Sequence, residues 1–337
     1  MNYFITGGTG FIGTHLSSLL HEVHPETRIY NLDIVEPGTP LPTVKNYKPA
    51  LGKGEEHAAT FIYCDVHQPI ELEKVNITPD DVIFNFAAVH RTPGHPDPAY
   101  FETNIRGAEN VCAFAERHGI RKIVFTSSIA PYGAAEELKE ETTLPMPNTP
   151  YGISKLVAEK IHQTWQAGGE GRQLTIVRPG VVFGRGENGN FTRLYWGIRG
   201  HKFMYPGRKD TIKACIYVKE LVRFMLYRLE HHDSGVELYN CCYEPAYTIE
   251  HIVESMKRVT NMKVKVPFMP GWLIMTAAGI AGALGSPMGI CPARVRKLQI
   301  STNICGKKLS ASGYRFRYTF EEALADWYKD NGNLYLQ

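Results

Sequence analysis

Three glycines spaced three residues apart, Gly7, Gly10 and Gly13, constrain the fold of this chain more than any other feature. They follow a short apolar run typical of a buried strand and open an amphipathic stretch that predicts a helix. In a dinucleotide-binding βαβ unit, such glycines permit a tight turn, let backbone N–H groups approach a pyrophosphate, and allow close helix–sheet packing. The spacing therefore predicts a phosphate-binding loop, with Phe11 and Ile12 at the same cofactor site.

An acidic residue stands at the end of the next predicted strand. Asp33 lies 20 residues beyond Gly13, where a carboxylate accepts hydrogen bonds from the adenosine ribose hydroxyls. Its charge would repel a 2′-phosphate, so the sequence predicts NAD rather than NADP. The alternative interpretation is a glycine-rich turn followed by an ordinary surface aspartate.

Apolar runs alternate with amphipathic stretches through the first half of the chain. This alternation predicts an α/β fold, a Rossmann-type doubly wound parallel sheet covered by helices on both faces. We expect an NAD-binding Rossmann domain over 1–180, to which 215–242 returns. Beyond it the pattern loosens, and 181–214 together with 243–337 are expected to form a smaller C-terminal substrate-binding lobe.

Tyr151 and Lys155 stand four residues apart in a predicted helix, and therefore share one of its faces. A free phenol has a pKa of about 10 and is a poor base at neutral pH. A nearby ammonium, assisted by the positive nicotinamide, favours the phenolate and lowers that pKa. Tyr151 could then take a proton from a carbinol while hydride leaves for the ring, and Lys155 could hold the nicotinamide ribose. The alternative is an exposed helix pair without a function.

Two serines, Ser127 and Ser128, follow the predicted strand over 122–126. In open parallel sheets, ligands bind at the carboxyl ends of the strands. A hydroxyl at this place can hydrogen-bond the reacting oxygen, although a serine pair is also common in a plain turn at the end of a strand.

Together these features resemble the extended short-chain dehydrogenase/reductase family, in its NAD-dependent epimerase/dehydratase group. The motifs that carry the resemblance occupy 6–13, 85–88, 103–107, 127–133, 149–155 and 178–179. The resemblance implies a catalytic triad of Ser128, Tyr151 and Lys155. It also implies further cofactor-binding residues: Asp65 and Val66 at the adenine, Ala87 and Ala88 along the cofactor, Asn104 as support of the active site, and Pro179.

The residues after Ser128 narrow the reaction that the resemblance implies. The 4,6-dehydratases of the family carry an aspartate and a glutamate where this chain has Ile129 and Ala130. Without these carboxylates, water elimination lacks its acid and base. The chain thus resembles the UDP-galactose 4-epimerase type, which predicts a nucleotide-sugar 4-epimerase with a transient 4-keto intermediate. An NAD(H)-dependent nucleotide-4-ketosugar reductase is the alternative.

Substrate contacts are less well defined by the sequence. His90 follows a predicted strand, Lys213 takes the place of an arginine of the 4-epimerases, and Arg294 is a candidate for the diphosphate. The uncharged segment over 268–289 resembles flavonol-reductase-like and hopanoid-associated branches of the family, so a reductase of a less polar carbonyl substrate stays open. Glycine and proline interrupt this segment, which favours a buried helix or a pocket wall over membrane attachment.

Charge and cysteine usage bear on partners and location. The net charge is +3 without blocks of like charge, which gives no indication of a nucleic-acid partner. The seven cysteines contain no CxxC pair, so neither a disulfide framework nor a metal site is predicted. No charged and apolar leader precedes the first predicted strand, which favours a cytoplasmic location. The family resemblance also implies a homodimer.

Overall fold

The computed structural model describes residues 1–39, 59–90, 94–233, 235–273 and 299–337. Its larger part is a seven-stranded sheet in which every neighbouring pair is parallel. In spatial order, the strands are β12 (Val236–Cys241), β7 (Gln173–Pro179), β5 (Lys122–Thr126), β4 (Val82–Asn85), β1 (Asn2–Thr6), β2 (Arg28–Asp33) and β3 (Thr60–Tyr63).

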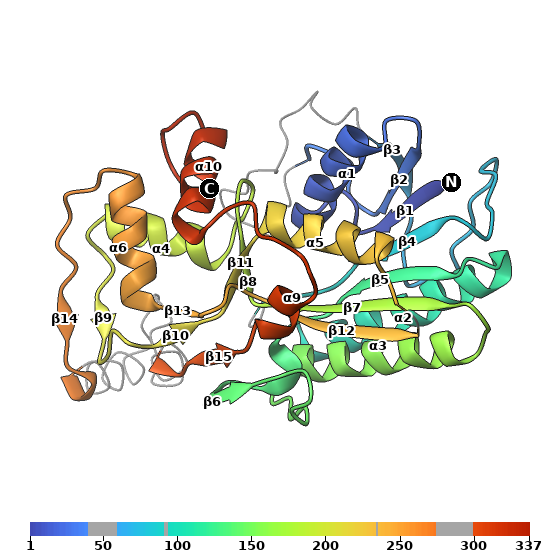
Figure 1. Ribbon diagram of the computed structural model, residues 1–337. Coiled ribbons are helices and arrows are strands. Elements are labelled where there is room, and N and C mark those ends of the chain that lie inside the picture. The colour runs from blue at the N-terminus through green and yellow to red at the C-terminus, as the bar shows by residue number, and fades with distance from the viewer. Residues whose placement is uncertain (40–58, 91–93, 234, 274–298) are drawn as a thin grey trace.

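Two pairs of helices cover this sheet (Figure 1). One face carries α1 (Phe11–Val23) and α5 (Val218–Glu230), and the other carries α2 (Asp97–His118) and α3 (Pro150–Ala167). The central strands are buried on both faces, and all four residues of β4 are buried. Strands of this kind require cover on both sides, which is the physical reason for the layered fold. The predicted Rossmann-type α/β fold is confirmed.

The chain reverses its direction of travel across the sheet between β1 and β4, which are neighbours. From β1 the chain continues to β2 and β3 on one side, and from β4 to β5, β7 and β12 on the other. Thr6 and Asn85 end the two strands in register, and the Thr6 hydroxyl donates to Asn85 Oδ1 at 2.8 Å. Open α/β sheets bind ligands at the carboxyl ends of the strands that flank such a switch point.

A second lobe lies to the left in Figure 1. Its core is rich in aromatic rings: Phe183 stacks on Phe191, and Phe320 contacts Phe183 edge-to-face. Short strands pair segments that are far apart in the sequence, so that 135–139 lies beside 302–304. Further helices are α4 (Asn190–Arg199), α6 (Ile249–Val259), α9 (Lys307–Ala311) and α10 (Phe320–Asp330), of which α9 packs against β12 of the main sheet. Further strands are β6 (Ala135–Lys139), β8 (Val181–Phe183), β9 (Tyr205–Pro206), β10 (Ile212–Lys213), β11 (Cys215–Tyr217), β13 (Tyr247–Thr248), β14 (Phe268–Met269) and β15 (Thr302–Ile304).

The uncharged segment over 268–289 falls mostly outside the described residues. Its first part forms β14 and one turn of helix that reaches Leu273. Residues 274–289, and the predicted substrate residue Arg294, are outside the described residues. Within the described part of the chain, no helix combines the length and the apolar composition needed to cross a bilayer.

Candidate active site

The glycine loop brings the carboxyl ends of β1 and β4 into close contact. Gly7 has a φ of +69°, and a Cβ atom there would lie 2.8 Å from the backbone nitrogen of Ala87. A Cβ atom at Gly13 would lie 2.6 Å from the Cα of Gly8. Both positions therefore require glycine. Gly10 is the N-cap of α1 and provides no side-chain cap, and a helix start of this kind suits a phosphate.

Asp33 ends β2 beside the glycine loop. One of its carboxylate oxygens accepts the Thr9 N–H at 3.1 Å, and the other accepts the Ile34 N–H at 2.8 Å. The loop and the acid predicted to bind the ribose are therefore held together. Phe11 and Ile12 form the start of α1 and are half-buried. These residues fit a dinucleotide, because α1 begins without a side-chain cap at the glycine loop and the Asp33 carboxylate stands beside that loop.

Asp65 and Val66 follow β3 and lie against α2. The Asp65 carboxylate accepts the His67 N–H at 3.0 Å and lies 2.6 Å from Nδ1 of the same ring, and these hydrogen bonds hold the pKa of Asp65 below its ordinary value. Nε2 of His67 lies 3.0 Å from the Thr103 hydroxyl of α2. Val66 is buried, and a Cβ atom at Gly107 would approach it to 3.1 Å. The predicted contact of these two residues with adenine stays a prediction.

Asn104 of α2 clamps the loop that follows β4. Its Oδ1 accepts the Val89 N–H at 2.9 Å, and its Nδ2 donates to the Val89 carbonyl at 3.1 Å and to the Ser154 hydroxyl at 2.8 Å. The Ser154 hydroxyl donates to the Tyr151 carbonyl at 2.9 Å. One buried carboxamide thus ties the loop over 87–90 to the helix that carries Tyr151.

The start of α3 places the predicted catalytic pair. The Thr149 hydroxyl accepts the Gly152 N–H at 3.1 Å, and Pro150 occupies the first helical position. Both features favour a helix beginning at this point. Tyr151 therefore lies in the first turn, and Lys155 lies one turn later on the same face.

The structure brings Ser128 and Tyr151 together. The Ser128 side chain interacts with the Tyr151 phenol, and Ser128 Oγ also accepts the Ala130 N–H at 3.1 Å. Burial raises the pKa of Tyr151 to about 12, and the interaction with Ser128 acts in the opposite direction. Within the chain itself, burial is the larger effect on the pKa of this phenol. The predicted lowering of that pKa by Lys155 together with the nicotinamide of NAD⁺ stays a prediction.

Lys155 is almost completely enclosed, with 3% of its surface exposed. Its Nζ lies 4.5 Å from the centroid of the Phe125 ring. Burial lowers the pKa of Lys155 to about 7, and the negative charge of Glu159 opposes this shift. The charge of the lysine therefore depends on the groups packed around it.

A buried ion pair lies one turn beyond Lys155. The Glu159 carboxylate accepts hydrogen bonds from Nε of Arg178 at 2.8 Å and from its Nη2 at 2.5 Å. It also accepts the Ser127 hydroxyl at 2.5 Å. Glu159 thus connects α3 to the ends of β5 and β7. Sequence reasoning missed this residue, although its position four residues after Lys155 puts it on the same helical face.

The remaining predicted cofactor and substrate residues are more scattered. Pro179 ends β7, and its carbonyl accepts the Ile129 N–H at 3.2 Å next to the serine pair. Lys213 lies on β10 and donates to a backbone carbonyl at 2.8 Å. His90 is exposed at the end of the loop after β4. The structure relates neither Lys213 nor His90 to Tyr151 by a direct contact among the interactions described, and Arg294 is outside the described residues.

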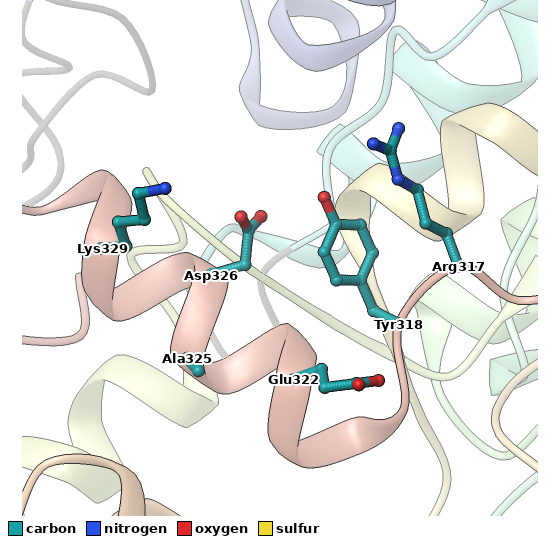
Figure 2. A pocket seen from close by; sticks show the side chains of 6 residues that line it. All are labelled: Arg317, Tyr318, Glu322, Ala325, Asp326 and Lys329. Carbon is teal, nitrogen blue, oxygen red and sulfur yellow. The ribbon is translucent and has the colours of Figure 1, made fainter.

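A surface pocket of about 410 Å³ lies on α10 and on the chain that leads into it (Figure 2). Asp326 accepts hydrogen bonds from the Lys219 ammonium and the Tyr217 hydroxyl, both at 2.7 Å. The pocket is lined by Arg317, Tyr318, Glu322, Ala325, Asp326 and Lys329. None of these is a predicted cofactor or catalytic residue, so we assign the pocket no part in the reaction.

The glycine loop follows β1 at the switch point of the sheet, and Tyr151 and Lys155 lie on α3, which precedes β7. This is the architecture of a short-chain dehydrogenase/reductase. The profile described as "NAD dependent epimerase/dehydratase family" matches residues 3–242. The chain therefore belongs to the NAD-dependent epimerase/dehydratase family, as its motifs predicted. The same finding confirms the predicted enzyme class and NAD as the cofactor.

Curated relatives are similar over most of the chain. The N-acetyl-alpha-D-glucosaminyl-diphospho-ditrans,octacis-undecaprenol 4-epimerase of Escherichia coli O157:H7 is 31% identical over 331 residues, which cover 96% of this chain and 93% of that protein. UDP-glucose 4-epimerase 3 of Oryza sativa subsp. japonica is 26% identical and covers 79% of this chain and 78% of its own length. Both relatives are named as 4-epimerases.

Solved structures show the same fold. The UDP-glucuronic acid 4-epimerase from Bacillus cereus, solved in complex with NAD, matches with a TM-score of 0.74. The match covers 99% of this chain and 97% of that chain at 18% identity. At this identity the likeness supports the fold alone.

Proposed function

We propose that the protein is an NAD-dependent 4-epimerase of a sugar carried on a diphosphate. The observation that carries the proposal is the position of Ser128 beside Tyr151, with Lys155 on the same face of α3 as the tyrosine. Ile129 and Ala130 follow this serine directly, so no carboxylate is available at the two positions where dehydratases have one. A site with a phenol and a hydroxyl, and without that acid pair, suits oxidation and reduction of one carbinol rather than elimination.

The residues of the chain would divide the work as follows. The Tyr151 oxygen takes the proton of the 4-hydroxyl and returns it after the 4-keto sugar has turned over in the site. Bound NAD⁺ supplies the hydride acceptor, and its reduced form supplies the donor. Ser128 holds the reacting oxygen against the phenol, and the charged form of Lys155 favours the phenolate that burial alone would disfavour.

A lipid-linked sugar is a second candidate for the substrate. The relative with 31% identity over nearly the whole chain is named for a diphospho-undecaprenol sugar, whereas the UDP-sugar 4-epimerases match at 26% over 79% of the chain. This difference supports a polyprenyl diphosphate as carrier in place of the predicted nucleotide. It agrees with the alternative of a less polar substrate that the apolar segment over 268–289 suggested.

A substrate comparison tests the proposal. Purified protein would be incubated with UDP-N-acetylglucosamine, UDP-glucose or N-acetylglucosaminyl-diphospho-undecaprenol, without added reduced cofactor. The sugar epimers would then be separated by chromatography and identified by mass spectrometry. We expect an equilibrium mixture of 4-epimers with at least one substrate, and none with the Tyr151→Phe variant. Turnover of a 4-keto sugar with equal consumption of NADH, and no epimer otherwise, would instead support the reductase.

Three further assignments stay predictions. They are the homodimer, the cytoplasmic location and the division into a domain over 1–180 with 215–242 and a lobe formed by 181–214 and 243–337. The position of β12 at the edge of the main sheet, paired with β7, supports this division.

A further inference from the structure

One long stretch near the C-terminus lacks acidic residues. Residues 255–320 contain no Asp or Glu, whereas Lys and Arg occur there eleven times. The stretch therefore carries a formal charge of +11 against +3 for the whole chain, which leaves −8 for the remainder. An asymmetry of this size favours contact of this part of the protein with an anionic partner.

Part of this stretch builds one end of the second lobe, which we call the β9–β14 corner and define as residues 202–207 and 263–273. The two strands pair in parallel, and the N–H of Gly207 donates to the Met269 carbonyl at 2.9 Å. In Figure 1 the pair lies at the end of the lobe away from the main sheet. The corner is therefore separate from the Tyr151 site.

Large apolar side chains of the corner are exposed to solvent. The exposed fraction is 51% for Phe268, 72% for Trp272, 41% for Leu273 and 36% for Met204. Single exposed apolar residues are ordinary, but several from one short region mark an interaction site.

Exposed lysines flank these apolar side chains. Lys202 stands before β9, and Lys263 and Lys265 stand before β14, all three exposed. Acids of the adjoining segments pair with other cations: Asp210 with Arg208 at 2.8 Å, Glu250 with Lys209 at 2.9 Å and Glu254 with Lys257 at 2.9 Å. Aromatic side chains next to lysines without intervening acids are the pattern of surfaces that lie at a membrane interface.

We propose that the β9–β14 corner docks on an anionic membrane surface, with Phe268 and Trp272 in the headgroup region and Lys263 and Lys265 against the lipid phosphates. A second copy of the chain fits the corner poorly, because the same positive charges would face one another across a two-fold axis. The inference concerns the location of the enzyme and does not rest on the proposed substrate. If the substrate is lipid-linked, docking brings the enzyme to its diphosphate.

Vesicle sedimentation tests this without any sugar substrate, so its failure is distinct from a failure of the proposed epimerase. The full chain would be mixed with phosphatidylcholine vesicles, with or without phosphatidylglycerol as about a third of the lipid. We expect the protein to sediment with the anionic vesicles at low salt and to be released as salt rises, because screening shortens the reach of the lysines.

Matched variants locate the contact. Phe268→Ser with Trp272→Ser should weaken binding by about tenfold or more, and Lys263→Glu with Lys265→Glu by a similar factor. Trp272→Phe should keep it. As controls, Tyr63→Ser removes an aromatic ring that is 68% exposed on β3, and Lys160→Glu reverses an exposed charge on α3. Both should sediment like the wild type, and melting temperatures would show that each variant is folded.

Three results would overturn the proposal. The wild type could stay in the supernatant with anionic vesicles, or sediment equally with vesicles of phosphatidylcholine alone. The folded double-serine variant could bind as well as the wild type. Loss of a dimer in that variant, together with no vesicle binding by the wild type, would assign the corner to contact between two copies instead.

Discussion

The charged side chains around α3 are buried and paired, whereas those of the β9–β14 corner are exposed to solvent. Around α3, Glu159 and Arg178 are 1% and 3% exposed and form a bidentate pair. At the corner, Lys263 and Lys265 are exposed. A buried charge needs a partner in fixed geometry, whereas an exposed charge contributes little to folding and is available to a ligand. The first region is built to position groups for chemistry, and the second to meet another surface.

The largest expected effect is on turnover, at Tyr151. Replacing it by phenylalanine removes the proton acceptor and leaves the ring, so we expect turnover to fall by about 10³-fold. Binding of NAD, measured by titration, should change little, since the glycine loop is intact. Retention of turnover by the folded variant would show that another group handles the proton.

The buried pair gives the next largest effect. Glu159→Gln leaves Arg178 buried without a counter-charge and should lower the free energy of unfolding by about 3–5 kcal/mol, measured by urea denaturation. Combining it with Arg178→Met should restore part of the loss. A cost of under about 1 kcal/mol for the single variant would mean that the pair behaves like a surface pair.

The same substitution also tests the charge of Lys155. Glu159 raises the pKa of the lysine against the effect of burial, which lowers it to about 7. In Glu159→Gln with Arg178→Met, the pKa should fall further, so the charged form would be lost at lower pH. The alkaline limb of the pH–activity profile should therefore move to lower pH relative to Arg178→Met alone. An unchanged limb would remove Glu159 from this role.

Two glycines with nearly the same φ angle allow the cost of backbone strain to be measured apart from the cost of a steric clash. Gly7 has a φ of +69° and faces Ala87, whereas Gly332 has a φ of +65° and no atom within 4 Å of a Cβ position. Gly332→Ala should cost about 1 kcal/mol from backbone strain. Gly7→Ala should cost more and abolish NAD binding, since the added methyl group would push β1 and β4 apart. Equal losses of stability in the two variants, with NAD binding kept in Gly7→Ala, would contradict the role assigned to the glycine loop.

A buried histidine predicts the response to acid. His162 is enclosed between α3 and the sheet, and burial lowers its pKa to about 4. In the unfolded chain this histidine takes up a proton at about pH 6.5, whereas in the folded protein it stays neutral down to about pH 4. The free energy of unfolding should therefore fall as the pH is lowered from about 6.5 to about 4. The expected slope for this one group is up to about 1.4 kcal/mol per pH unit, and it should be flatter in His162→Gln. Identical slopes would contradict this.

The smallest effect is expected at the corner. Lys263→Glu should change the free energy of unfolding by less than about 0.5 kcal/mol, because exposed substitutions away from packed features are nearly neutral. A large loss of stability would mean that the lysine is part of the packing of the lobe, and the contrast with α3 would fail.

The parts of this molecule that could be predicted from its sequence are the ones encoded by short spacings. The glycine loop, Asp33 and the Tyr151–Lys155 pair depend on neighbours within one strand and one helix, and their arrangement follows from the period of each element. The pairing of 135–139 with 302–304 joins segments far apart in the chain, for which no local pattern exists. The role of Glu159 and the raised pKa of Tyr151 depend on burial, which three-dimensional packing decides.

The transfer of hydrogen at C4 tests the central claim most directly. Protein with its co-purified cofactor would be given UDP-N-acetylglucosamine, or the polyprenyl-diphosphate counterpart, with deuterium at C4 of the sugar. Mass spectrometry of the product epimer would then follow the label without added NADH. The account predicts that the deuterium stays at C4 in the epimer, since hydride leaves and returns within one site. Loss of the label to water would contradict it.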